Sequence, residues 1–237
     1  MIDIKIKIQG NFGNLDYEFN YNFKKGVTSL LGNIGTGKST IVNSIVGFNN
    51  TLCCSVTING KNINHKKKLQ NNLLPISIMF QDRTLIPNMT AKQNILFAQK
   101  RSSKKNTISQ HLDYEYVVEK LKIRNILNKY PRELSGGQQQ LITLCRTFLI
   151  KSDFIILDEP MSALDIKNKS LVLSLIREVN KKNKIPILII SHSIEEIIQI
   201  SDHLIIIDRG KIIGHGNFSD MLFRKNFINL FGKFESS

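Results

Sequence analysis

Gly32-Asn33-Ile34-Gly35-Thr36-Gly37-Lys38-Ser39-Thr40 follows the pattern of a glycine, four residues and then Gly-Lys-Ser. The apolar run Val27 to Leu31 predicts a buried strand before this loop, and Lys38 to Val46 predicts a helix after it. Glycines let backbone N–H groups turn inward around a β-phosphate, and the helix N-terminus adds its positive dipole end. Lys38 can reach the β- and γ-phosphates, and the Ser39 hydroxyl can ligate Mg²⁺. An ordinary strand-to-helix turn is the alternative, but it does not require Lys-Ser after the last glycine. The loop therefore predicts nucleotide binding.

A second element that points to nucleotide chemistry is a pair of acidic residues at the end of an apolar run, Phe154-Ile155-Ile156-Leu157-Asp158-Glu159. Four apolar residues that end in a carboxylate place Asp158 at the carboxyl edge of a sheet, where open α/β folds bind ligands and Mg²⁺ needs an acidic partner. Glu159 points elsewhere and can polarise an attacking water. Two solvated acids at the end of a strand are the plainer interpretation, which the phosphate loop makes less attractive.

Strand and helix patterns alternate along the chain. Further strands are predicted at Ile76 to Phe80, Phe154 to Leu157 and Ile185 to Ile190, and further helices at Gly137 to Leu149 and Ser170 to Val179. This alternation indicates an α/β fold with a mainly parallel sheet that is covered on both faces. Leu204 to Ile207 and Lys211 to Ile213 flank Asp208-Arg209-Gly210, which predicts a hairpin, and Lys100 to Asp113 is polar, which predicts a surface excursion.

Length and composition limit the class of protein. The chain has 237 residues, enough for one large domain, and 41% of them are hydrophobic, which is typical of a protein with a sizeable core. Three cysteines are too few for a disulfide scaffold, and the apolar runs are shorter than the roughly 20 residues of a membrane helix. The net charge of +14 favours anionic partners, although a bias toward lysine explains it equally well.

Leu134-Ser135-Gly136-Gly137-Gln138 lies upstream of Asp158-Glu159-Pro160. Together with the phosphate loop, this segment resembles the signature of the ATP-binding cassette (ABC) ATPases, and the resemblance covers almost the whole chain. The remaining landmarks of that family follow in order: Gln81 in Met79-Phe80-Gln81-Asp82, Ser162-Ala163-Leu164-Asp165, and His192 in Ile190-Ser191-His192-Ser193.

The resemblance implies a P-loop fold with an antiparallel β subdomain and a helical subdomain at about 82–150, within one ABC ATPase domain over 1–237. It also implies an ATP sandwich between two such domains. One protomer would bind ATP with Asn33, Ile34, Gly35, Thr36, Gly37, Lys38, Ser39 and Thr40, and the other would add Ser135, Gly136, Gly137 and Gln138.

Further roles come with the same resemblance. Glu159 would be the general base, and His192 would hold the γ-phosphate and the attacking water in line. Asp158 and Ser39 would bind Mg²⁺, Gln81 would touch Mg²⁺ or water, and Asp165 would communicate across the dimer. Members usually stack adenine on an aromatic residue of the first strands; Phe12 is the best-placed candidate and Tyr17 the second. Tyr17, Phe19, Tyr21 and Phe23 alternate, which is more typical of a strand face.

Two departures from the family pattern stand out. Gln139-Gln140-Leu141 replaces a common Gln-Gln-Arg, although Arg146 is retained, and Asn33-Ile34 replaces a frequent Pro-Ser. Neither change removes a phosphate ligand. We therefore expect hydrolysis to survive at a different basal rate.

The compact length favours the separate ATPase subunit of an importer without a C-terminal regulatory domain. Such a subunit would be a homodimer, would bind integral membrane permease subunits at the cytosolic face of the inner membrane, and would serve a solute-binding protein indirectly. The face of Leu85 to Ala98 would receive the permease. Pro75 to Gln81, Asp158 to Asp165 and Ser191 to Ser193 most resemble thiamine importer ATPases. Molybdate importer ATPases are a close rival through Phe80 to Asp82, Phe12 to Asn14 and Ser191 to Ile197.

Two other classes remain as alternatives. The net charge of +14 permits an ABC-type ATPase that acts on nucleic acid, but the lysines at 66–68, 104–105 and 181–182 are dispersed and lack interleaved aromatics. No nucleic-acid partner is therefore expected. A non-catalytic nucleotide-binding module is disfavoured because both Glu159 and His192 are present.

Overall fold

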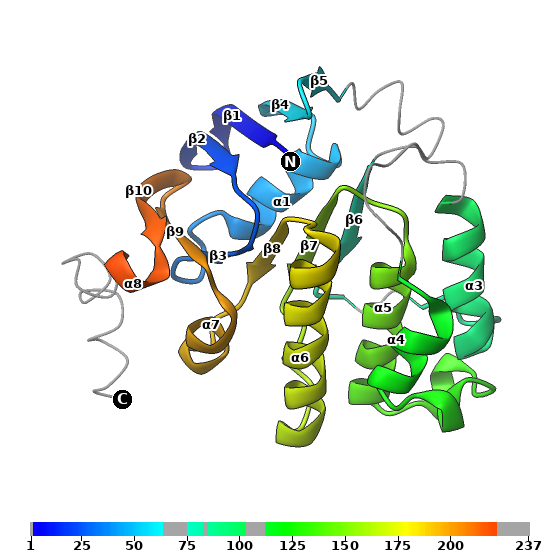
Figure 1. The fold of residues 1–237 in the computed structure, drawn as a ribbon. Coiled ribbons are helices and arrows are strands. Elements are labelled where there is room, and N and C mark those ends of the chain that lie inside the picture. The colour runs from blue at the N-terminus through cyan, green and yellow to red at the C-terminus, as the bar shows by residue number, and fades with distance from the viewer. Residues whose placement is uncertain (1, 64–74, 83–84, 103–111, 222–237) are drawn as a thin grey trace.

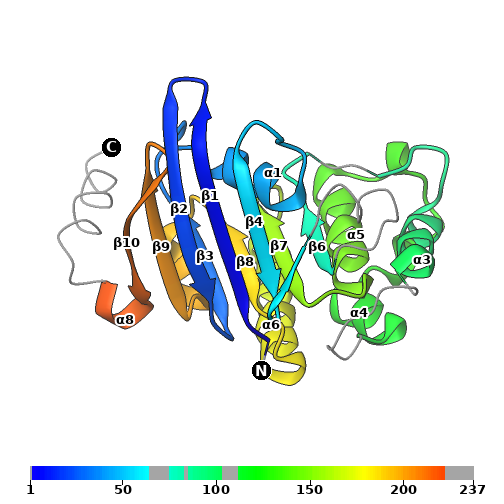
Figure 2. The ribbon, with the colours of Figure 1, turned by 90° about the horizontal axis from the view of Figure 1, so that it is seen from above.

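A computed structural model describes residues 2–63, 75–82, 85–102 and 112–221. One ten-stranded sheet runs through this part of the chain in the order β5-β4-β1-β2-β10-β9-β3-β8-β7-β6. Figures 1 and 2 show its first strands on one side of the molecule and helices α3, α4 and α5 on the other.

The parallel part of the sheet is built from short apolar strands. These are β3 (Val27–Leu31), β6 (Ile76–Met79), β7 (Phe154–Asp158), β8 (Ile187–Ile190) and β9 (His203–Asp208). Neighbouring pairs in the order β9-β3-β8-β7-β6 all run parallel. Their side chains are buried on both faces, as expected for a sheet with helices on each side.

The remaining strands are β1 (Ile4–Phe12), β2 (Leu15–Phe23), β4 (Cys53–Ile58), β5 (Lys61–Asn62) and β10 (Lys211–Asn217). They pair antiparallel with their neighbours, except that β10 meets β2 in parallel at Lys211 and Glu18. Ile4, Ile6 and Ile8 are buried while Lys5 and Lys7 face outward, so β1 has the alternation of a half-buried strand. The buried face packs with α1 (Lys38–Val46) in one core cluster, which fixes the helix behind the phosphate loop.

Most of the helices cover the face of the parallel strands opposite to α1. A second core cluster joins α3 (Ala91–Ser102), α4 (Tyr114–Lys120), α5 (Gly136–Leu149) and α6 (Ile166–Asn183) to strands β7 and β8. Two 3-10 turns, η1 (Arg124–Ile126) and η2 (Pro131–Glu133), connect α4 to α5. The two last helices are α7 (Ile194–Ile200) and α8 (Phe218–Met221). Among the described residues, no helix combines the length and the apolar character needed to cross a membrane.

The predicted α/β fold is confirmed, with small shifts of boundaries. The helix after the phosphate loop has the expected bounds, and the hairpin turns at Arg209 and Gly210, both with positive φ. Tyr17, Phe19 and Phe23 lie buried on one face of β2, as a strand pattern predicts. Of the polar stretch at 100–113, residues 103–111 lie outside the described part of the chain, as do the lysines at 66–68 and 104–105.

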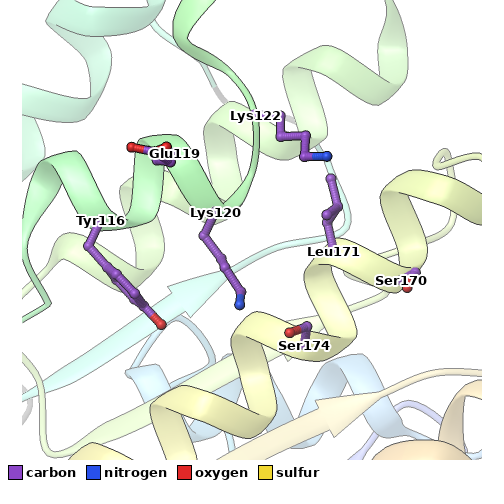
Figure 3. Close-up of a pocket in the computed structure, with 7 residues that line it drawn as sticks. All are labelled: Tyr116, Glu119, Lys120, Lys122, Ser170, Leu171 and Ser174. Atoms are coloured by element: carbon purple, nitrogen blue, oxygen red, sulfur yellow. The ribbon is translucent and has the colours of Figure 1, made fainter.

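A polar cluster links α4 to α6. Glu178 accepts hydrogen bonds from the Tyr116 hydroxyl and the Lys120 ammonium, and the Lys182 ammonium lies 5.0 Å from the centre of the Tyr116 ring. A pocket of about 490 Å³ opens beside this cluster, and Figure 3 shows Tyr116 and Lys120 reaching toward α6 there. Its lining includes none of the predicted nucleotide-binding residues.

Candidate nucleotide site

The phosphate loop joins β3 to α1 through two glycines in left-handed backbone conformations, Gly35 at φ 82° and Gly37 at φ 101°. A Cβ on Gly37 would lie 2.7 Å from both Cε1 and the hydroxyl oxygen of Tyr17, so no larger residue fits there. The Thr36 hydroxyl donates to the Asn33 carbonyl at 2.8 Å, and Gly210 N–H donates to the Thr36 carbonyl at 2.9 Å. The loop is thus shaped by its own bonds and by the β9–β10 turn.

The Lys38 ammonium donates to the Gly32 and Asn33 carbonyls at 2.7 and 2.9 Å, which holds it across the loop. Burial lowers the pKa of Lys38, while Glu159 and Asp158 act in the opposite direction. Both carboxylates are therefore close enough to interact with this ammonium. The phosphate loop and the acidic pair belong to one site.

Asp158 and Glu159 end β7 at its carboxyl edge, and only 6% and 7% of their surfaces are exposed. Burial is the main reason that the pKa of Asp158 rises to about 6, and the neighbouring Glu159 and Asp82 add to it. A cation beside this carboxylate would favour its ionised form and lower its pKa. Glu159 itself has φ 51°, a strained conformation for a residue with a side chain.

Glu159 contacts His192, which follows the neighbouring strand β8. Because β7 pairs with β8 in the register Asp158 to Ile190, the residues that follow the two strands lie side by side, and Glu159 N–H donates to the Ile190 carbonyl at 2.9 Å. The His192 Nδ1 to Glu159 Oε1 distance is 2.6 Å. Burial raises the pKa of Glu159, and His192 opposes that effect. The His192 side chain is 75% exposed and the Glu159 side chain 9%, so the histidine borders solvent and the carboxylate is buried.

Gln81 follows β6 and is exposed at the same edge of the sheet. Its neighbour Asp82 acts on the pKa of Asp158, which places this loop beside the acidic pair. The structure thus brings Lys38, Asp158, Glu159 and His192 together, with the Gln81 loop next to them. Ser39 and Thr40 begin α1 directly after Lys38.

The signature segment forms the N-terminus of α5. Ser135 is the N-cap: its hydroxyl accepts from Gln138 N–H at 3.3 Å, and Gln138 Oε1 accepts from Ser135 N–H at 3.0 Å. Gly136 and Gly137 open the helix, and a Cβ on Gly137 would lie 2.9 Å from the Ala163 carbonyl oxygen. Asp165 caps α6 by accepting from Asn168 N–H at 2.8 Å.

The two candidate adenine platforms differ in exposure. Phe12 ends β1 and is 44% exposed, so its ring is available for stacking. Tyr17 is 2% exposed and packs beneath Gly37, so the second candidate is a core residue. Asn33 and Ile34 are exposed on the phosphate loop.

Sequence reasoning missed Gln140, which is 1% exposed and bonds the segment after Glu159. A signal was present, since Gln140 is the polar residue that precedes the apolar run Leu141 and Ile142 within a helix. Leu141, where the family pattern has arginine, is 4% exposed and part of the helical core.

A family model described as "ABC transporter" matches residues 17–162. The chain therefore belongs to the ABC transporter family, as its motifs predict. Among curated relatives, the molybdenum import ATP-binding protein ModC of Haemophilus ducreyi is 32% identical over 216 residues, which cover 89% of this chain and 59% of the relative. ModC of Saccharophagus degradans is 31% identical over 199 residues, with 84% and 54% covered. The chain thus spans somewhat more than half the length of these relatives.

Solved structures show the same fold. A nucleotide-free ATP-binding cassette of an ABC transporter superposes with a TM-score of 0.79 at 24% identity. The superposition covers 98% of this chain and 99% of the cassette. A dimeric cassette bound to ADP and Pi gives 0.73 at 23% identity, with coverage of 92% and 98%. The relatives named for molybdenum import support the rival prediction of the sequence, and the prediction of a thiamine importer finds no support among them.

Proposed function

We propose that the chain binds and hydrolyses ATP as the cassette subunit of an importer. The observation that carries this proposal is the 2.6 Å pair of His192 and Glu159, set beside Asp158 and the phosphate-loop lysine. A buried carboxylate that is oriented by a histidine is suited to take a proton from water. A module that only binds nucleotide has no need of such a pair.

Each residue of the site has a role in this proposal. Gly35, Gly37 and Thr36 present backbone N–H groups to the phosphates, and Lys38 exchanges its loop carbonyls for phosphate oxygens. Glu159 holds the attacking water and accepts its proton. With a proton on each ring nitrogen, His192 donates from Nδ1 to the Glu159 carboxylate and from Nε2 to a γ-phosphate oxygen. Phe12 stacks on adenine.

The donors beside the phosphate loop fit Mg²⁺. The Ser39 hydroxyl, the Asp158 carboxylate and the Gln81 amide are oxygen ligands of the kind this ion takes, and Asp158 is buried at a raised pKa that a cation would lower. When bound, Mg²⁺ neutralises the charge that builds up on the phosphates. The protein contributes few ligands because phosphate and water supply the others.

The signature residues Ser135, Gly136, Gly137 and Gln138 complete the site in a partner subunit. The N-terminus of α5, with its capped serine and two glycines, is suited to contact a γ-phosphate. Two copies arranged head to tail would bind two ATP molecules, and Asp165, at the start of α6, would lie at the contact between them.

The test of hydrolysis is Glu159→Gln, which keeps the shape of the side chain and removes the base. We expect turnover to fall by roughly a thousandfold with ATP binding retained, and the variant to accumulate as an ATP-bound dimer. Glu195→Gln, an exposed acid on α7, is the matched control and is expected to leave turnover unchanged. Wild-type turnover in Glu159→Gln would remove Glu159 from the role of base.

The transported solute is proposed to be molybdate or a related oxyanion, because the relatives quoted above are named for molybdenum import. The subunit would act at the cytosolic face of the inner membrane with permease subunits, and a solute-binding protein would deliver the anion to them. The chain should be purified with its permease in vesicles. Stimulation of ATP hydrolysis by molybdate-loaded binding protein supports this solute, whereas stimulation by thiamine or by DNA alone contradicts it.

The permease is proposed to dock on the face at Leu85 to Ala98. Leu85 is 8% exposed, so this residue supports the face from within, whereas Leu96 and Phe97 on α3 are 40% and 39% exposed. A cysteine in place of Phe97 should cross-link to the permease with a yield that depends on ATP. A yield that ignores nucleotide would contradict the proposed coupling.

A further inference from the structure

The side chain of Gln140, on α5, contacts the segment that follows strand β7. It is 1% exposed, and its side-chain hydrogen bonds go to Glu159, Ser162 and Ala163. Its position is one helical turn beyond Gly136 and Gly137, on the face of α5 that packs against the Ala163 carbonyl. Gln140 therefore sits between the signature loop and the residues around Glu159.

Both ends of the Gln140 amide are used. Nε2 donates to the Glu159 carbonyl at 2.9 Å and to the Ser162 hydroxyl at 3.3 Å, and Oε1 accepts from Ala163 N–H at 2.9 Å. A glutamate at this position would set a carboxylate against the Glu159 carbonyl, and an apolar residue would remove the acceptor of the half-buried Ala163 N–H. Glutamine is the side chain of this length that satisfies donor and acceptor together.

The residue that Gln140 holds is under backbone strain. Glu159 has φ 51°, a conformation that costs free energy and persists only where the surroundings enforce it. Hydrogen bonds hold it from opposite sides: Glu159 N–H donates to the Ile190 carbonyl of β8, and the Glu159 carbonyl accepts from Gln140 Nε2 and from the Ser162 hydroxyl and N–H. This backbone sets the direction in which the Glu159 carboxylate leaves the strand and meets His192.

We propose that Gln140 is a positioning residue for Glu159. From the signature helix, its side chain fixes the backbone of Glu159, which carries the catalytic carboxylate, and the Ser162–Ala163 segment. This inference rests on the proposed ATPase function. It also assigns a physical link between the two nucleotide sites of the dimer, since α5 would contact the partner's ATP at its N-terminus and hold its own Glu159 one turn further along.

The direct test replaces Gln140 by methionine, which keeps the length and removes both bonds, and by glutamate, which keeps only the acceptor. We expect kcat to fall about tenfold or more in both variants, with KM for ATP within about twofold of wild type. Thr143→Val is the matched control, because the Thr143 hydroxyl donates to the Gln139 carbonyl of its own helix and not to the segment after β7 in the described part of the chain. A kcat within twofold of wild type in both Gln140 variants overturns the proposal.

A second measurement separates positioning of Glu159 from a displaced signature loop. In heterodimers that carry Glu159→Gln in one subunit, the remaining turnover uses Glu159 of the other subunit and the signature of the inactivated one. Gln140→Met in the subunit with the intact Glu159 should abolish most of that turnover, and in the inactivated subunit it should have at least fivefold less effect. An equal or larger effect from the inactivated subunit overturns the proposal. Absence of ATP hydrolysis by the wild-type chain would instead contradict the proposed function itself.

Discussion

At the scale of single residues, the nucleotide site depends on backbone geometry as much as on charged groups. Gly37 is the N-cap of α1 at φ 101° and packs against Tyr17, a core residue of β2. The ring of Tyr17 therefore supports the phosphate loop from below and demands the absence of a Cβ at Gly37. This contact explains why Tyr17, an aromatic residue near the loop, is a packing residue.

Gly37→Ala tests that support. The added Cβ would lie 2.7 Å from two atoms of Tyr17 in a left-handed conformation, so we expect a loss of about 3 kcal/mol in the free energy of unfolding, with weaker ATP binding. Gly13→Ala is the control, since Gly13 has φ 59° with open space around it; its expected cost is about 1 kcal/mol. Urea denaturation measures both. Equal losses would show that the Tyr17 contact does not matter.

That the charged residues of the candidate site lie together could be predicted from the sequence, because the ends of parallel strands meet at one edge. Asp158, Glu159 and His192 each follow an apolar run, and the pairing of β7 with β8 then brings Glu159 to His192. The same reasoning could not place Gln140. Its partners lie 19 to 23 residues away in the chain, and only the packing of α5 against the segment after β7 brings them together.

At the scale of elements, the sequence predicted which segments are helical better than it predicted the residues at which the helices begin and end. Apolar periodicity predicts a helix from Ser170 to Val179, whereas α6 runs from Ile166 to Asn183. Its extra turns are polar and carry no periodic signal. The Asp165 cap adds the first turn, and Lys184 ends the helix in a left-handed conformation at φ 56°.

The contact between α4 and α6 predicts how stability depends on pH. The bonds from Lys120 and Tyr116 lower the pKa of Glu178 to about 2. A depressed pKa means that the ionised form stabilises the fold above the unfolded-state pKa, and this stabilisation disappears as the pH falls from about 4.5 toward 2. Glu178→Gln should therefore cost about 1 kcal/mol at neutral pH and progressively less in acid.

Thermal or urea unfolding at several pH values measures that difference. Glu115→Gln is the control, because the ion pair of Glu115 with Arg124 is 61% exposed on both sides and should contribute little. A cost of Glu178→Gln that stays constant from pH 7 to pH 3 would contradict the assigned role of the Glu178 carboxylate.

At the scale of the whole molecule, the phosphate loop and the signature occupy separate parts of one chain. The loop lies between β3 and α1, whereas the signature begins α5 and packs against the segment that follows β7. A head-to-tail dimer would place the loop of each subunit against the signature of the other. Mixing two differently defective chains distinguishes this arrangement from a site completed within one chain.

We expect Lys38→Ala to disable the phosphate loop and Ser135→Arg to disable the signature, each with a loss of ATP hydrolysis in its own homodimer. In a heterodimer of the two, the intact loop of the Ser135→Arg subunit faces the intact signature of the Lys38→Ala subunit, so one of the two sites is whole. Purified heterodimers should recover hydrolysis well above either homodimer, up to roughly half of the wild-type rate. If each chain completed its own site, every subunit of the mixture would carry one defect and no activity would return.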